Sequence, residues 1–231
     1  MRFVAAVFLL VVVLAMPAIA ERTNSDEGDG WGINVGGTFF VPLEETIAWM
    51  GEDATCLSGN QVFLLRDGRG YPVDKDKFFI VQALAPQEYF DLHGKRHSRF
   101  VSKPFVMISI RALADFFSYR VDLLDSLIIV SGNQKQKAFI ARDYLQFHFN
   151  GLRGQGRFGD FVFPISGARK GFTTPRGWFE VFLKDKHHKS GTYQRPRGGA
   201  PMPLSLFFAQ NVAYHVGKVG VGSHGCIHGR R

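Results

Sequence analysis

Two short segments in the first half of the chain carry apolar residues at helical spacing. Leu43, Ile47 and Met50 fall on one face of a helix that Pro42 is suited to begin, because the first helical turn has no use for its missing N–H. The second segment follows Ser109, whose side chain favours a helix start, and its apolar positions are Ile110, Leu113, Ala114 and Phe117. The pattern predicts one helix within residues 41–51 and another within residues 108–118.

Each predicted helix is followed by strand-like segments with a polar turn. Residues 54–56 and 62–65 follow the first helix, and residues 121–123 and 127–130 follow the second. Another apolar segment, Phe78–Leu84, lies between the two units and favours a further strand. The repeat of helix and strands predicts an α+β module over residues 38–134.

The pattern changes after the polar stretch Ser131–Lys137, which we interpret as a hinge. From Ala138 onward, strand-like runs alternate with glycine-rich turns, and helical periodicity is scarce. Asn150-Gly151 is a hairpin signal between a strand over Ile140–Phe149 and a returning strand over Asp160–Ile165, and a further strand is expected over Trp178–Leu183. The second half is therefore expected to be a mainly β domain over residues 138–231.

The N-terminus has the layout of a secretory signal peptide. Arg2 precedes the apolar run Phe3–Met16, and the small residues of Pro17–Ala20 supply a cleavage signal after Ala20. An uncleaved membrane anchor is the alternative, although the run is short for a membrane span. We therefore predict a signal peptide over residues 1–20, and the polar, glycine-rich residues 21–37 are expected to form a flexible leader.

Composition and charge agree with an exported globular protein. Of the 231 residues, 45% are hydrophobic and 21% are charged, and no segment after the N-terminal run is long and apolar enough to cross a bilayer. Cleavage would remove one arginine and no acid, which lowers the net charge from +8 to +7. A basic exported protein suits polyanionic surroundings such as the cell envelope or periplasm. Nucleic acid is excluded as a partner by export and by the lack of a recognition motif.

The chain has two cysteines, Cys56 and Cys226. A disulfide between them would close a long loop and would stabilise the fold, but it would also consume the thiol that lies in a reactive setting. We expect two free thiols, with Cys56 packed as a small hydrophobe in a strand. The disulfide remains the alternative.

The densest chemistry lies in the last nine residues, Ser223–Arg231. They place Cys226 between His224 and His228, and a third histidine, His215, lies eleven residues upstream. A thiol needs a base to become a nucleophile at neutral pH. Gly225 lets the backbone come close to a developing oxyanion without a clash from a Cβ atom. The pattern favours thiol-based acyl transfer.

Several motifs of the second half occur in a fixed order. Ser166-Gly167 is followed by Thr174-Pro175-Arg176-Gly177-Trp178-Phe179, then by Pro201-Met202-Pro203, by His215-Val216-Gly217 and by Ser223-His224-Gly225-Cys226. Together they resemble the catalytic domain of the L,D-transpeptidases, and the resemblance covers residues 138–231. It implies an enzyme without a cofactor that attacks a peptidoglycan stem peptide and forms a thioester.

The resemblance also implies roles for individual residues. Cys226 would be the nucleophile and His215 the general base, and Ser223 and His224 would shape the site. The N–H groups of Gly225 and Cys226 would form the oxyanion hole, and the substrate contacts would be Tyr193, Ser190 and His228. An amine acceptor gives a crosslink, whereas water as the acceptor gives carboxypeptidase activity.

This chain departs from the family pattern at His228, where most members have arginine or asparagine. Histidine has no permanent charge, so recognition of a substrate carboxylate would depend on pH. Members of the family also usually continue for at least one more strand or helix beyond this point, which predicts an open sheet edge here.

Residues 38–132 resemble a different family, the small α+β module found at the N-terminus of copper amine oxidases. The resemblance implies a spacer or a binding module on an envelope protein, and it implies no copper chemistry. An α+β domain with an accidental repeat is the alternative.

Two other functions compete with the enzyme. One is a wall-binding protein that keeps the fold but has lost turnover, which His228 and the missing continuation would explain. The other is a zinc site, because four residues of the cluster are of zinc-ligand type: His215, His224, Cys226 and His228. The zinc interpretation leaves the accompanying turn motifs without a purpose.

Overall fold

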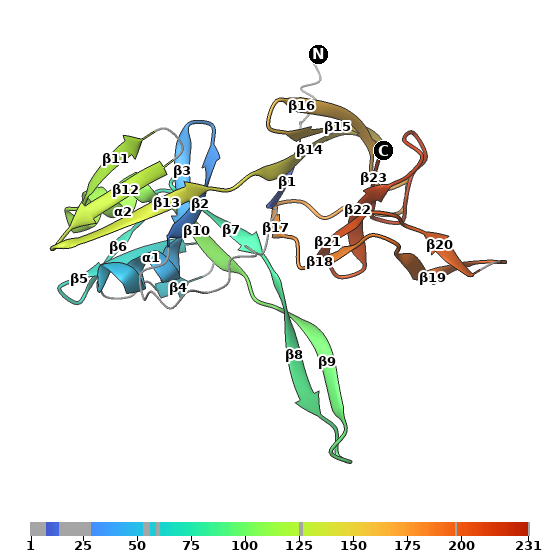
Figure 1. The fold of residues 1–231 in the computed structure, drawn as a ribbon, viewed down its shortest axis with the longest axis horizontal. Coiled ribbons are helices and arrows are strands. Elements are labelled where there is room, and N and C mark those ends of the chain that lie inside the picture. The colour runs from blue at the N-terminus through green and yellow to red at the C-terminus, as the bar shows by residue number, and fades with distance from the viewer. Residues whose placement is uncertain are drawn as a thin grey trace. The chain divides into compact units, whose positions relative to one another are not determined.

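The computed structural model describes residues 8–13, 29–52, 56–58, 61–124, 127–196 and 198–230. It is mainly β, with 59% strand and two short helices, and its strands form several sheets (Figure 1). Two compact units are present. The first comprises residues 16–81 and 105–142, and the second comprises residues 1–15, 82–104 and 143–231.

Both predicted helices are confirmed in the first unit. Helix α1 spans Leu43–Met50 and ends at Gly51, whose φ of 74° is easily adopted by glycine. Helix α2 spans Ile110–Phe117, and the Ser109 side chain accepts a hydrogen bond from the Ala112 N–H. The apolar spacing thus predicted both the helices and the faces that they bury.

The strands of the first unit surround these helices. β2 (Gly30–Val35), β3 (Thr38–Pro42), β10 (Phe105–Ser109) and β7 (Phe78–Gln82) are neighbours in that order. β11 (Arg120–Leu124), β12 (Leu127–Gly132) and β13 (Lys135–Ala141) form a meander, and β13 pairs with β2 in parallel. β4 (Cys56–Ser58), β5 (Gln61–Arg66) and β6 (Arg69–Pro72) form a small antiparallel sheet.

The leader predicted over residues 21–37 is wrong for its last part. Residues 30–35 form β2, in which Ile33 is fully buried, and Gly36 and Gly37 make the turn to β3 with positive φ. Trp31 and Ile33 alternate with small residues. This strand-like pattern decides the local structure in spite of the high glycine content. Residues 21–28 lie outside the described part of the chain.

The hinge predicted at Ser131–Lys137 is also wrong. These residues form the turn of the β12–β13 hairpin, in which Asn133 and Gln134 have φ of 49° and 61°. The strand predicted over Ile140–Phe149 is two strands, because β13 ends at Ala141 and β14 begins at Tyr144. Polar Arg142 and Asp143 separate them, and this break divides the two units.

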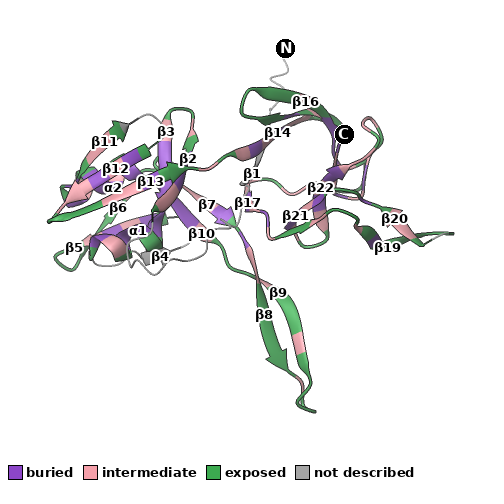
Figure 2. Ribbon diagram, viewed as in Figure 1, coloured by how far each residue is buried: buried purple, intermediate pink, exposed green. Residues whose placement is uncertain are grey.

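The core of the first unit gathers apolar residues from both helices and the surrounding strands, shown in purple in Figure 2. Val41, Ile108 and Leu113 are fully buried in it. Leu113 projects from the inner face of α2, so this helix holds its position through apolar contacts.

Replacement of Leu113 by alanine is expected to lower the free energy of unfolding by about 2–5 kcal/mol, because it removes buried methyl groups and leaves a cavity. Arg111→Ala on the exposed side of the same helix is the matched control and is expected to change it by less than about 0.5 kcal/mol. Denaturant unfolding measures both. Equal effects of the two substitutions would contradict the assignment of the buried face.

Most strands of the second unit lie in one sheet. β14 (Tyr144–Asn150), β15 (Arg153–Phe158) and β16 (Phe161–Ser166) form an antiparallel meander. The predicted turn at Asn150-Gly151 is confirmed. The strand that returns from it is β15, so the prediction of Asp160–Ile165 as the returning strand is wrong; that segment overlaps the next strand, β16. β16 pairs with β23 (Ile227–Gly229), followed by β22 (Val212–Val216), β21 (Ser205–Ala209) and β18 (Leu183–Asp185). The pairing of β22 with β23 is parallel.

Residues 8–13 form β1, which pairs antiparallel with β14 and parallel with β17 (Trp178–Glu180). Residues 1–7 and 14–20 of the predicted signal peptide lie outside the described residues. Cleavage after Ala20, which stays a prediction, would remove β1 and leave the facing edges of β14 and β17 unpaired.

Two ribbons complete the second unit. β8 (Leu84–Phe90) pairs with β9 (Arg96–Ser102), and β19 (Lys189–Arg195) pairs with β20 (Gly198–Pro201). Within the described residues, no helix has the length and apolar character needed to span a membrane.

Candidate functional site

The predicted nucleophile and the predicted base lie on one face of two adjacent parallel strands. In the register of β22 and β23, Tyr214 faces Ile227 and His215 faces His228. Side chains alternate between the two faces of a sheet, and Tyr214 and Ile227 pack in the apolar core of the unit. Cys226, one residue before β23, instead packs beside Ala213 in a separate cluster. His215, His228 and Cys226 therefore share the face opposite that core.

His215 is buried and held in one orientation. Its Nδ1 lies 3.0 Å from the carbonyl oxygen of Val216. A carbonyl only accepts, so Nδ1 carries the proton of the neutral ring and Nε2 is left as an acceptor. Desolvation lowers the pKa of His215 to about 4, against the opposing effect of the Val216 carbonyl, and the nearby His228 and His188 lower it further. At neutral pH the ring is therefore uncharged, and its Nε2 carries no proton.

Burial of neutral His215 predicts that the protein loses stability in acid. Because its folded-state pKa of about 4 lies below the ordinary 6.5, the unfolded chain binds more protons between these values. Stability from this group is complete above pH 6.5 and falls by up to about 3 kcal/mol as the pH drops to 4. Denaturant unfolding at pH 7.5 and pH 4 tests this. His215→Gln should reduce the difference between the two pH values, and an unchanged difference would contradict the prediction.

Cys226 is a free thiol that is half-buried. Its Sγ–H donates to the carbonyl oxygen of Asn211 at 4.0 Å, and the side chain packs with Phe182, Met202 and Phe207. Burial raises the pKa of this thiol, while a backbone hydrogen bond from Ala213 acts in the opposite direction. The sulfur is therefore protonated at neutral pH.

The structure does not join this thiol to the imidazole. His215 and Cys226 are diagonal neighbours across the strand pair, and both are among the described residues, where no hydrogen bond links them. Diagonal neighbours on one face of a sheet lie farther apart than directly opposite residues. The two side chains therefore share a face but are not engaged with each other.

Ser223 connects the loop before Cys226 to Gly167, which directly follows strand β16. Its Oγ accepts from the Gly225 N–H at 3.0 Å and lies within hydrogen-bonding distance of the carbonyl oxygens of Cys226 and Gly167. Its own N–H donates to Gly167 at 3.0 Å. The side chain is buried, and its hydrogen bonds hold the loop that precedes Cys226.

Gly225 adopts a conformation that other residues rarely reach. Its φ is 138°, and a Cβ atom there would lie 3.3 Å from the carbonyl oxygen of Thr173. The Gly225 N–H is occupied by Ser223, so of the two predicted oxyanion donors only the Cys226 N–H remains a candidate.

His224 belongs to an aromatic stack rather than to the strand face that carries His215. Its ring stacks on Tyr193 with centroids 3.9 Å apart, and the edge contact with Phe172 measures 4.5 Å. Arg169 places a guanidinium nitrogen against His224 Nε2, and the Arg169 guanidinium lies over the Phe172 ring. Desolvation and this nearby cation lower the pKa of His224. The sequence patterns did not single out Arg169 or Phe172, although Arg169 follows the Ser166-Gly167 turn closely.

The other predicted substrate contacts are engaged within the protein. Ser190 is buried, and its Oγ accepts from the Tyr193 N–H at 3.0 Å, which fixes the irregular start of β19. The His228 ring contacts the His215 ring at a centroid distance of 4.8 Å, and its Nδ1 lies 3.1 Å from the Val221 carbonyl oxygen. His228 therefore packs against the candidate base. Tyr193 is 42% exposed and remains the most accessible of the three.

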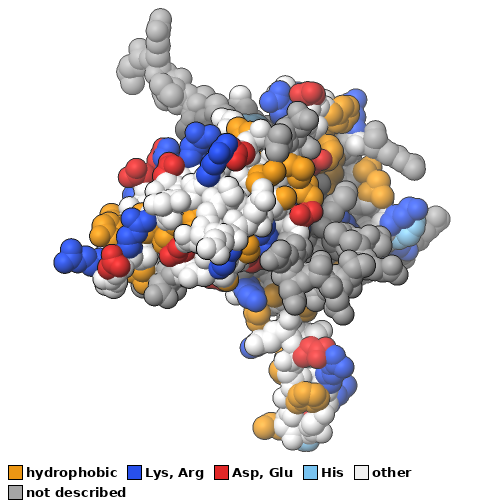
Figure 3. Space-filling view, turned by 60° about the vertical axis from the view of Figure 1, so that its left-hand side comes forward, with side chains coloured by type: hydrophobic (Ala, Val, Ile, Leu, Met, Phe, Trp, Pro, Cys, Tyr) orange, Lys and Arg blue, Asp and Glu red, His pale blue; other side chains and the backbone are white. Residues whose placement is uncertain are grey.

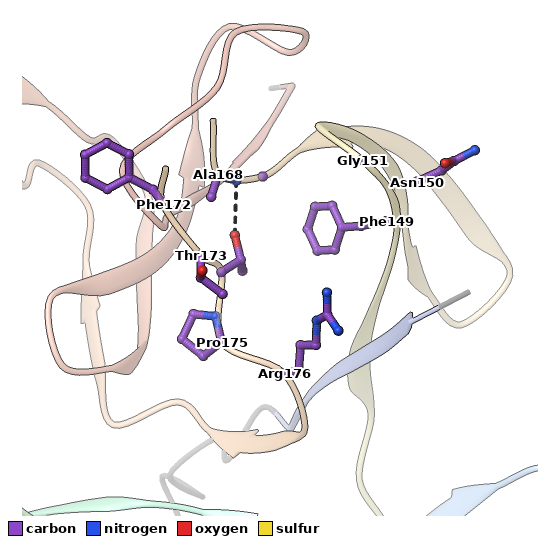
Figure 4. A pocket seen from close by; sticks show the side chains of 10 residues that line it. Phe149, Asn150, Gly151, Ala168, Phe172, Thr173, Pro175 and Arg176 are labelled. Atoms are coloured by element: carbon purple, nitrogen blue, oxygen red, sulfur yellow. Dashed lines mark hydrogen bonds between the residues drawn. The ribbon is translucent and has the colours of Figure 1, made fainter. Parts of the chain in front are cut away.

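A cavity of about 320 Å³ lies beside this site (Figure 4). Phe149 and Arg176 border it, and the Thr174 hydroxyl accepts from the Ala168 N–H at 3.1 Å on its wall. Thr173 lines the cavity and also approaches Gly225. The Thr-Thr-Pro-Arg segment therefore connects the cavity wall with the loop that carries the thiol.

The four residues of zinc-ligand type named above do not gather at one point. Among the residues that the structure describes, no group of three or more His, Cys, Asp or Glu side chains is arranged to hold a metal ion. The imidazole of His224 is turned into the aromatic stack, which separates it from the other ring pair.

No family model matches this chain, and no curated protein or solved structure is similar enough to it to show a relationship.

Proposed function

We propose that this protein is an exported L,D-transpeptidase, a cysteine acyltransferase that acts on peptidoglycan stem peptides. One observation carries the proposal: Cys226 and a buried, neutral His215 share one face of two adjacent parallel strands. The order of the motifs, from Ser166-Gly167 to Ser223-His224-Gly225-Cys226, supports it. Residues 138–231 would form the transpeptidase-like domain, and residues 38–132 would form a module like that of the copper amine oxidases, serving as a spacer or binding module in the envelope.

The reaction would begin with a rotation of the Cys226 side chain. In the structure its Sγ–H is given to the Asn211 carbonyl, so the thiol must leave this partner to meet His215 Nε2. The imidazole then takes the proton, and the thiolate attacks the carbonyl carbon of the bond between the L-centre and the terminal D-amino acid. The Val216 carbonyl, which already accepts from Nδ1, stabilises the imidazolium that forms.

The acyl-enzyme would form and break with the same two groups. The imidazolium gives its proton to the departing amine of the D-amino acid, which leaves a thioester on Cys226. An amine of a second stem peptide then attacks the thioester, loses a proton to His215 and takes the acyl group, and the thiol is restored. The Cys226 N–H is the donor for the oxyanion, since that of Gly225 is occupied.

The assay is incubation of the full chain with a tetrapeptide stem carrying a terminal D-alanine. The proposal predicts release of D-alanine, crosslinked dimers, or both, and mass spectrometry separates the transpeptidase from the carboxypeptidase outcome. Release of neither would contradict the proposal.

A second candidate is a wall-binding protein with impaired catalysis. It is favoured by the raised pKa and apolar packing of Cys226 and by the lack of a bond to His215 among the described residues. Sedimentation with purified cell walls, without turnover of the tetrapeptide, would support this alternative.

A further inference from the structure

The β8–β9 ribbon is a hairpin that is exposed along most of its length. Its two strands form a two-stranded sheet of their own, in register from Leu84 opposite Ser102 to Phe90 opposite Arg96. Phe100 is anchored by a ring contact of 4.7 Å with Phe182, but the residues beyond it are mostly exposed, as the green ribbon in Figure 2 shows. A hairpin exposed in this way buries little apolar surface, so its outer half contributes little to the core.

The turn at the end of the ribbon is nevertheless held firmly. The Asp91 carboxylate accepts from the N–H groups of His93 and Lys95 at 2.9 Å each, and it lies 2.8 Å from the His97 ring. The Asp91 N–H donates to the Lys95 carbonyl, and the Gly94 N–H donates to the Asp91 carbonyl. The five residues of the turn are thus fixed by their own hydrogen bonds.

This turn presents apolar side chains to solvent. Leu92 is fully exposed, and Phe90 is 69% exposed. Exposed apolar residues are common singly, but a phenylalanine and a leucine presented together on a structured turn indicate a contact surface. Figure 3 shows hydrophobic side chains next to basic ones toward the end of the ribbon.

The charge around these apolar residues is positive. Residues 82–104 contain four lysines and arginines and two acids, and both acids are paired, Glu88 with Arg96 and Asp91 with His97. Lys95 and Lys103 have no acidic partner within the described part of the chain. Arg99 bonds only to the neutral Gln87 and lies over the Tyr89 ring. The unpaired charge of the ribbon is therefore cationic.

We propose that the end of the β8–β9 ribbon docks onto a membrane surface that contains anionic phospholipid. Leu92 and Phe90 would enter the boundary between headgroups and acyl chains, where their apolar surface leaves water. Lys95 and Arg99 would meet the lipid phosphates, since long basic side chains place their charge at the headgroups while their stems stay in apolar surroundings. This inference does not depend on the enzymatic proposal.

The first test is sedimentation of the full chain with vesicles of phosphatidylglycerol and phosphatidylethanolamine. The double variant F90S/L92S is expected to lower the partition coefficient by about tenfold or more. Phe161 is 68% exposed, so F161S is a matched control and should bind like the wild type. Binding should weaken in high salt and on vesicles of phosphatidylcholine alone, because the electrostatic part is then lost.

A second measurement locates the ribbon directly and does not depend on how strongly other segments bind. The L92W variant is expected to show a blue-shifted emission component that brominated phospholipids quench, and F161W is expected to show none. Absence of quenching in L92W would overturn the proposal. So would a concentration-dependent dimer of the full chain in lipid-free buffer that F90S/L92S abolishes, since the ribbon would then dock on a second copy.

Discussion

Replacement of Cys226 by alanine is expected to abolish release of D-alanine from a tetrapeptide stem, with a fall in rate of at least about 10³-fold. The thiol is the strongest nucleophile on the shared face of β22 and β23, where the residues beside it are His215, His228 and Ala213. Without Cys226 no thioester can form, so no acyl group is available for transfer to the second stem peptide.

The matched control is Cys56→Ala, which removes the other cysteine of the chain. This variant is expected to keep wild-type turnover, measured as D-alanine released and dimer formed from the same stem. Full activity of Cys226→Ala, or loss of activity in Cys56→Ala alone, would contradict the assignment. Circular dichroism of both variants separates loss of chemistry from loss of fold.

Replacement of His215 by glutamine is expected to lower kcat/KM by about 10²–10⁴-fold, which is the usual contribution of a positioned general base. Burial raises the pKa of the Cys226 thiol, so at neutral pH the thiolate does not form unaided. Because the pKa of His215 is about 4, the wild-type rate should rise with pH through that value as the ring becomes neutral. The variant should lack this limb of the pH profile.

His187→Gln is the control for His215, because His187 is exposed and lies outside the shared face of β22 and β23. It is expected to leave kcat/KM and its pH profile unchanged. A His215 variant with the wild-type rate and the wild-type acid limb would show that another group takes the proton.

Apolar spacing predicted the parts of the fold that depend on local periodicity. The faces of α1 and α2 were evident from Leu43, Ile47 and Leu113, because a helix places residues three and four apart on one side. The Asn150-Gly151 turn was equally local. The prediction of a flexible leader was wrong at Trp31 and Ile33. Two apolar residues among glycines form a buried strand only because they pair with β3, which lies outside the segment.

The site was predicted less completely, because its details arise from contacts between distant segments. The motifs indicated Ser223, Gly225 and Cys226, and the parallel register of β22 and β23 then places His215 on the same face as the thiol. The stack of His224 on Tyr193 joins residues 31 positions apart in sequence. No spacing within one segment could predict it, or show that Ser223 occupies the Gly225 N–H.

The contacts of His228 differ from those that the sequence suggested. The sequence suggested a weaker and pH-dependent contact with a substrate carboxylate. Its ring instead contacts His215, and its Nδ1 is directed at the Val221 carbonyl. His228 therefore lies against the candidate base, and Arg169 contacts His224 in the loop before the thiol.

The most direct test of the central claim is intact-mass spectrometry of the full chain after exposure to a carbapenem, which acylates a thiol that is accessible and activated. We predict one covalent adduct on Cys226, retained in Cys56→Ala, lost in Cys226→Ala and formed much more slowly in His215→Gln. An unmodified wild-type protein, or an adduct that persists in Cys226→Ala, would contradict the account.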